Sequence, residues 1–155
     1  MKKIISLIFI SCLTCFAFAD EVKKSQVSTQ KLLELLNSDY KEIATIDEDD
    51  DLRIADESLG IKLFATVDSD RVFIKFTTGW KKSDNISDAR LSKIINWWNY
   101  NKIFATASWN DSSIHLEYFM AFDGGVNSEN FNSTIEWLFS IAEAFGEYLE
   151  GEDAI

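Results

Sequence analysis

The C-terminal part of the chain carries the pattern that most restricts the fold. From about residue 126 to 148, apolar side chains recur every three or four positions, the spacing of an α-helix. They form two neighbouring stripes: a first of Phe131, Ile135, Leu138, Ala142, Phe145 and Leu149, and a second of Trp137, Ile141, Ala144 and Tyr148. A helix that lies on a sheet needs an apolar stripe of only about 100°. The second stripe therefore needs another contact, within the chain or with another protein.

A second amphipathic helix is predicted to begin after Ser87, a residue type suited to cap a helix N-terminus. Its apolar stripe consists of Leu91, Ile94, Ile95 and Trp98. Trp97 lies about 100° away around the helix axis, and Tyr100 lies further still. We expect the stripe in the core and these two aromatic side chains outside it.

Alternating apolar and polar residues predict antiparallel strands between the helices. The predicted strands cover residues 40–46, 52–55, 61–67, 72–76, 104–110 and 113–122. Ser28 is the expected N-cap of a short first helix that carries Leu32, Leu33, Leu35 and Leu36. The order α-β-β-β-β-α-β-β-α predicts an α+β domain over residues 28–150, with helices packed on an antiparallel sheet.

The first nineteen residues have the composition of a secretory signal peptide. Lys2 and Lys3 precede an uncharged apolar run over residues 4–16, and small residues around Ala19 form a cleavage site. Cleavage after Ala19 predicts a periplasmic or secreted protein. The run is short for a bilayer span, so we expect no stable membrane anchor after cleavage. Residues 20–27 are polar and are predicted to be a flexible lead-in.

Removal of this peptide changes the chemistry of the remaining chain. Cys12 and Cys15 leave with it, so the mature chain has no thiol for catalysis, disulfides or metal binding. Lipidation of either cysteine is an open alternative. Without Lys2 and Lys3 the chain has thirteen basic and twenty-six acidic residues, a formal charge of −13. Nucleic acids and anionic membranes are therefore not expected partners.

Few residues could carry catalysis or bind a metal ion. His115, the sole histidine, lies in a strand beside Glu117 and is interpreted as a structural or surface residue, since nothing nearby resembles a nucleophile elbow. The acidic run over residues 47–51 has alternate acidic residues, as calcium loops do. Leu52 and Ser58, however, stand where such a loop needs Gly and Glu. The run is interpreted as a solvated hairpin turn, with cation binding left open, and no cofactor is predicted.

Several of these features together resemble the YbjN family of bacterial proteins. They are Asn96-Trp97-Trp98-Asn99, Ala105-Thr106-Ala107, Leu116-Glu117, and the turn Gly124-Gly125-Val126 before the long helix. The resemblance covers about residues 28–149. It implies a fold similar to that of type III secretion chaperones, a role in regulating sensory transduction, and no established catalytic residues. An exported copy departs from those chaperones, which act in the cytoplasm.

We therefore expect an exported, non-catalytic interaction or chaperone-like module, not an enzyme, with a protein partner or a second copy bound to it. The expected partner-binding residues are Trp97, Tyr100, Trp137, Ile141 and Tyr148, because aromatic residues are favoured at interfaces. The alternative for the second stripe is packing beneath the first helix. A second hypothesis is an envelope protein that binds a small ligand or metal, or an enzyme that uses two converging carboxylates.

Overall fold

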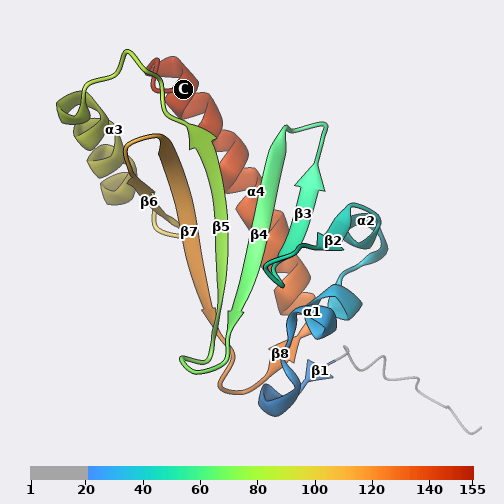
Figure 1. Ribbon diagram of the computed structural model, residues 1–155. Helices are drawn as coiled ribbons and strands as arrows, with labels where there is room; N and C mark the ends of the chain where they lie inside the picture. Colours follow the sequence, from blue (N-terminus) through green and yellow to red (C-terminus); the bar gives the residue numbers. More distant parts are fainter. Residues whose placement is uncertain (1–20) are drawn as a thin grey trace, which may run out of the picture.

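A six-stranded antiparallel sheet forms the centre of the structure (Figure 1). The computed structural model describes residues 21–155. The strands lie in the order β2-β3-β4-β5-β7-β6. Their bounds are Ala44–Ile46 for β2, Leu52–Asp56 for β3, Ile61–Asp68 for β4, Phe73–Lys81 for β5, Thr106–Trp109 for β6 and Ser113–Ala121 for β7. The predicted antiparallel sheet is confirmed.

The long C-terminal helix lies on one face of this sheet, and the shorter helices lie toward its two edges, near β6 and near β2 (Figure 1). The helices are the 3₁₀ turn η1 (Lys24–Gln26), α1 (Thr29–Leu35), α2 (Ser38–Glu42), α3 (Asp88–Asn101) and α4 (Ser128–Gly151). Figure 1 shows α4 crossing behind the sheet, whereas the other face of the central strands is uncovered. The predicted caps are confirmed: the hydroxyl of Ser28 accepts a hydrogen bond from the Lys31 amide, and Ser87 accepts one from the Arg90 amide.

The core lies between α4 and the covered face of the sheet. The whole first stripe of α4 is buried, as predicted. It meets alternate strand residues that are also buried, namely Leu63, Ala65, Ile74, Phe76, Ile114 and Leu116. The ring of Phe131 packs 6.0 Å from that of Phe76, and the ring of Phe145 packs 5.3 Å from that of Trp80. Burial of each such side chain contributes about 1.5–3 kcal/mol to folding.

The segment before β2 differs from the prediction. Residues 40–42 were predicted as strand but belong to α2, and β2 begins only at Ala44. The cause is local, since the Asn37 side chain accepts a hydrogen bond from the Tyr40 amide at 3.1 Å and so caps a new helical turn. The Tyr40 ring then stacks on Phe139 of α4, with 5.7 Å between centroids.

The predicted flexible lead-in over residues 20–27 is a second correction. Strand β1 (Glu21–Val22) pairs with β8 (Val126–Asn127), and both Val22 and Val27 are buried. Residues 21–27 therefore form part of the packed domain. Gly125 makes this pairing sterically feasible, because its φ is +96° and a Cβ there would lie 2.5 Å from the carbonyl oxygen of Val22.

Two predictions concern residues that the structure does not describe. The signal peptide and its cleavage after Ala19 lie outside residues 21–155. Within that range, the helices are too short or too polar to cross a bilayer.

Candidate functional site

Asn99 fastens the C-terminal end of α3 to the edge strand β6. Its side-chain amide donates to the carbonyl oxygen of Ala107 at 2.8 Å, and its carbonyl oxygen accepts from the Ala107 amide at 2.7 Å. Ala107 faces Leu116 in the register with β7. The backbone amide and carbonyl of Ala107 point away from β7, and both are already hydrogen-bonded to Asn99. These two bonds hold the last turn of α3 against β6 and close that edge of the sheet at Ala107.

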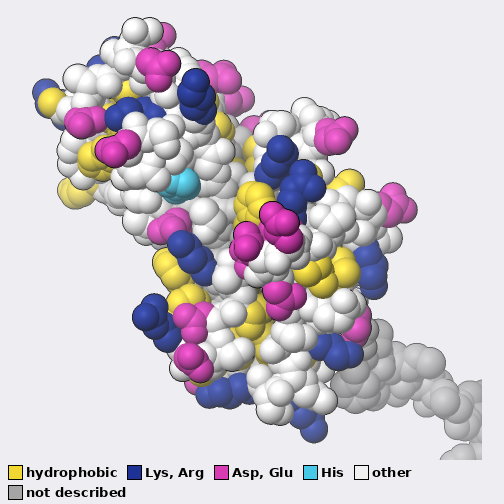
Figure 2. Space-filling view, in the orientation of Figure 1, with side chains coloured by type: hydrophobic (Ala, Val, Ile, Leu, Met, Phe, Trp, Pro, Cys, Tyr) yellow, Lys and Arg dark blue, Asp and Glu magenta, His cyan; other side chains and the backbone are white. Residues whose placement is uncertain are grey.

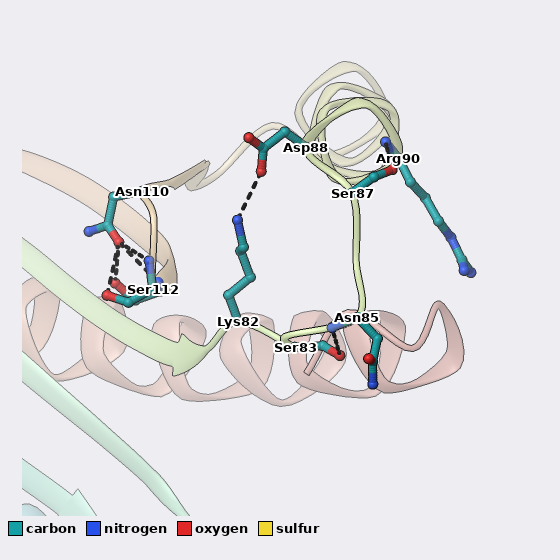
Figure 3. A network of polar contacts seen from close by, with 9 residues as sticks. Lys82, Ser83, Asn85, Ser87, Asp88, Arg90, Asn110 and Ser112 are labelled. Atoms are coloured by element: carbon teal, nitrogen blue, oxygen red, sulfur yellow. Dashed lines mark hydrogen bonds and ion pairs between the residues drawn. The ribbon is translucent and has the colours of Figure 1, made fainter.

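A polar network holds the other end of α3, as Figure 3 shows. The ammonium of Lys82 donates to the carboxylate of Asp88 in the first turn of α3 at 2.9 Å, and the Lys82 amide donates to the Ser112 carbonyl. The amide of Ser83 donates to the Ala154 carbonyl at 2.8 Å, directly beyond α4. The connection between β5 and α3 is therefore tied to both the sheet and the end of α4.

Aromatic rings join α3 to α4. Trp98 is buried, as predicted, and its ring lies 4.6 Å from that of Phe145. Tyr148 stacks on both Trp98 and Trp97, with centroids 5.6 and 5.0 Å apart. The Tyr148 hydroxyl donates to the Ile94 carbonyl at 3.5 Å. Burial raises the pKa of Tyr148 above its ordinary value, which favours the protonated hydroxyl that donates this bond.

An apolar groove opens where the chain leaves α3 and passes beside α4. Its volume is about 550 Å³, and its lining residues are Trp98, Lys102, Ile103, Phe104, Ala105, Glu136, Trp137, Ser140, Ile141 and Ala144. Trp137 is 60% exposed although its ring packs 5.4 Å from that of Phe104, and Ile103 is fully exposed. The charged groups that line it are Glu136 and Lys102, whose ammonium lies 5.6 Å from the Trp98 ring centroid. The end of α3, the loop over residues 102–105 and the middle of α4 thus form a hollow with large apolar side chains on both walls.

The structure places four of the five predicted partner-binding residues in two pairs, of which one lines the groove. Trp137 and Ile141 line the groove, and Trp97 and Tyr148 stack on each other where α3 meets α4. Tyr100 is 88% exposed on α3. The second stripe of α4 is covered in part, but by α3 and not by the first helix as the alternative supposed. Partner binding by these residues stays a prediction.

Sequence reasoning missed the wall that faces α4. Phe104 was predicted to begin a strand, but β6 begins only at Thr106, and Lys102 and Ile103 were given no role. The available signal was the pair of adjacent large apolar residues Ile103 and Phe104, a few residues after the end of the apolar stripe of α3. Binding residues are often found on loops, so large apolar residues in a loop indicate a binding surface.

A second hollow, of about 750 Å³, lies on the open face of the sheet. Figure 2 shows charges of both signs scattered over this face, with small hydrophobic areas between them. His115 lies there, with its Nε2 2.8 Å from the Ser113 hydroxyl and 3.2 Å from the Asn110 amide. Glu117 pairs with Lys75 and not with His115. No Ser-His-acid arrangement results among these residues.

The acidic run forms the turn between β2 and β3. The Asp47 carboxylate accepts hydrogen bonds from the amides of Asp49 and Asp51, at 3.1 and 2.9 Å, and so organises the turn. Asp50 occupies the left-handed region, with φ of 63°. Over residues 21–155, no group of three or more His, Cys, Asp or Glu side chains is arranged to hold a metal ion.

Perturbed titratable groups lie outside the groove and have structural causes. A hydrogen bond from Lys31 lowers the pKa of Glu34, and one from Ser58 lowers the pKa of Asp56. Burial raises the pKa of Tyr40. These shifts reflect local contacts that order turns and helices, and they do not mark a catalytic centre.

Together, these features define an α+β domain in which α3, α4 and the loop between α3 and β6 line an apolar groove. The model of the YbjN family, described as "Putative bacterial sensory transduction regulator", matches residues 29–151. The chain therefore belongs to the YbjN family, which confirms the resemblance seen in its sequence.

A solved structure shows the same fold. It is described as the crystal structure of "YbjN, a putative transcription regulator from E. coli", and it is 14% identical to this chain with a TM-score of 0.55. The match covers 80% of this chain and 88% of that one. No curated protein matches the chain. Similarity to type III secretion chaperones stays a prediction.

Proposed function

We propose that this YbjN-family protein is an exported, non-catalytic interaction or chaperone-like module that holds a protein partner in the groove between α3 and α4. One observation carries the proposal: Trp137 and Ile103 are exposed on opposite walls of the same apolar hollow. Large apolar side chains gathered in this way mark binding surfaces, whereas single exposed ones do not. The protein would then exert the regulation named in the family description by binding its partner protein.

The chemistry of the groove favours binding over catalysis. Glu136 and Lys102 are its charged lining residues, so the described part of the groove has one carboxylate and no carboxylate pair. General acid–base catalysis of the kind considered from the sequence needs two such groups near a reacting bond. An apolar small molecule is the second candidate ligand, because typical ligand pockets measure about 300–1,000 Å³ and the groove measures about 550 Å³.

A crosslinking pull-down from the native cell envelope tests the proposal. The tagged protein would be compared with Trp137→Glu and with a matched control, Phe119→Glu, which alters a half-exposed aromatic residue on the open face of the sheet. We expect the wild-type and the Phe119 variant to capture the same protein and the Trp137 variant to lose it. Equal capture by all three would contradict the groove as the site, and loss only with Phe119→Glu would move the site to the open face.

Export is tested separately by the mass of the protein recovered from the envelope fraction. Cleavage after Ala19 gives a chain that begins at Asp20. A recovered chain that retains residues 1–19 would contradict the proposed export.

A further inference from the structure

We infer that the occupant of the groove is a cationic amphipathic helix, with an apolar stripe about two turns long and Lys or Arg beside it. The inference rests on the proposed function, because it names the partner of the same groove. Three observations support it: the negative charge of α4 beside the groove, the closed sheet edge next to the groove, and the spacing of the apolar residues on its α4 wall.

The charge of α4 is entirely negative. The helix contains five Glu and no Lys or Arg. Glu136, Glu143 and Glu147 are exposed and lie on one ridge, at spacings of seven and four residues. This ridge is next to the ridge of Trp137 and Ile141, because consecutive residues lie about 100° apart around a helix. The α4 side of the groove is therefore acidic, with Lys102 the one cation among the lining residues on the opposite side, and a cationic partner complements the α4 side.

The same charge disfavours a second copy of the chain as the occupant. A two-fold interface places the same surface of each subunit against the other. The glutamates of α4 would then face glutamates, in a chain whose formal net charge is already −11. Like charges brought together across an interface oppose binding.

The geometry favours a helix over an added strand. Asn99 already pairs with the outward amide and carbonyl of Ala107, so β6 cannot extend the sheet there. The apolar wall instead consists of Trp137, Ile141 and Ala144, at positions i, i+4 and i+7 of α4. These seven steps span about 10 Å, the length over which a partner helix presents its own i, i+4 and i+7 side chains.

Two synthetic peptides test the inference. The first is an 18-residue helix with Leu at stripe positions and Lys elsewhere, and the second has Glu in place of every Lys. Isothermal titration of the purified protein should show the Leu/Lys peptide binding at least roughly tenfold more tightly than the Leu/Glu peptide, a preference that salt reduces. Trp137→Ala should raise the Kd of the Leu/Lys peptide roughly 30-fold. Ile103→Ala, which changes a fully exposed side chain, should also raise the Kd of the Leu/Lys peptide.

Single-charge variants separate the acidic rim from general attraction to an acidic protein. Glu136→Gln and Glu143→Gln should each raise the Kd of the Leu/Lys peptide roughly two- to fivefold. Asp49→Asn removes one negative charge from the turn between β2 and β3 and should leave the Kd unchanged. Equal weakening by all three variants, or binding that both Trp137→Ala and Ile103→Ala leave unchanged, would overturn the inference.

The remaining outcomes distinguish the inference from the proposed function. If both peptides bind equally and Trp137→Ala weakens both, the groove binds partners but the preference for a cationic one is wrong. If light scattering shows a dimer that Trp137→Glu dissociates, the occupant is a second copy and the inference is overturned. If neither peptide binds and the pull-down also fails to depend on Trp137, both the inference and the proposed function are wrong.

Discussion

Replacement of Asn99 by Ala should destabilise the protein although the side chain is near the surface. The substitution removes two hydrogen bonds to Ala107, of 2.7 and 2.8 Å, each worth about 0.5–1.5 kcal/mol. Ala is a better helix former than Asn by about 0.5 kcal/mol, which offsets part of the loss. The free energy of unfolding should therefore fall by about 0.5–2.5 kcal/mol, measured by urea denaturation.

Asn96→Ala is the matched control for this prediction. Asn96 is exposed on the same helix, and its side chain makes one long contact, 3.4 Å to the Ser92 hydroxyl. Its replacement should leave stability unchanged or slightly raised. Asn99→Asp should be destabilised like Asn99→Ala, because a carboxylate accepts from the Ala107 amide but cannot donate to its carbonyl. Equal unfolding midpoints for Asn99→Ala and Asn96→Ala would refute the assigned role of Asn99.

Three further substitutions test other parts of the structure by urea denaturation. Gly125→Ala should lower the free energy of unfolding by more than about 1 kcal/mol, because the φ of Gly125 is +96° and a Cβ would meet the Val22 carbonyl. The control Gly124→Ala places its Cβ in open space and should leave stability unchanged. Equal stabilities of the two variants would contradict this prediction. Val22→Ala should lower the free energy of unfolding by about 1.5–3 kcal/mol if the N-terminal segment packs as described. A loss near zero would instead support a flexible segment over residues 20–27. Asp56→Ala should be destabilised at pH 7, because the Ser58 hydrogen bond lowers the folded pKa of Asp56 and so stabilises the fold above the ordinary Asp pKa of about 4. That difference should shrink as the pH falls through the folded pKa, and a difference that grows at pH 3 would contradict it.

Patterns governed by local spacing could be predicted from the sequence. The first stripe of α4 and the stripe of α3 follow from a period near 3.6, and both are buried. The caps Ser28 and Ser87 follow from the hydrogen bonds that hydroxyls offer to free amides. In each case the cause lies within a few residues of the effect.

Features that depend on distant contacts could not be predicted. The strand of Glu21 and Val22 exists because it pairs with Val126 and Asn127, about a hundred residues away, and its own two residues carry no strand pattern. The groove likewise depends on how the loop over residues 102–105 packs beside α4, and a sequence pattern does not show that packing.

Site-specific photocrosslinking tests the groove most directly. Benzoylphenylalanine would replace Ile103 on the groove wall and, as a control, Leu59, an exposed aliphatic residue in the turn between β3 and β4. In the cells that produce the protein, the probe at position 103 should crosslink a partner protein, and the probe at position 59 should not. Trp137→Glu should abolish the product at position 103. A product formed at position 59 and absent at position 103 would contradict the groove as the binding site.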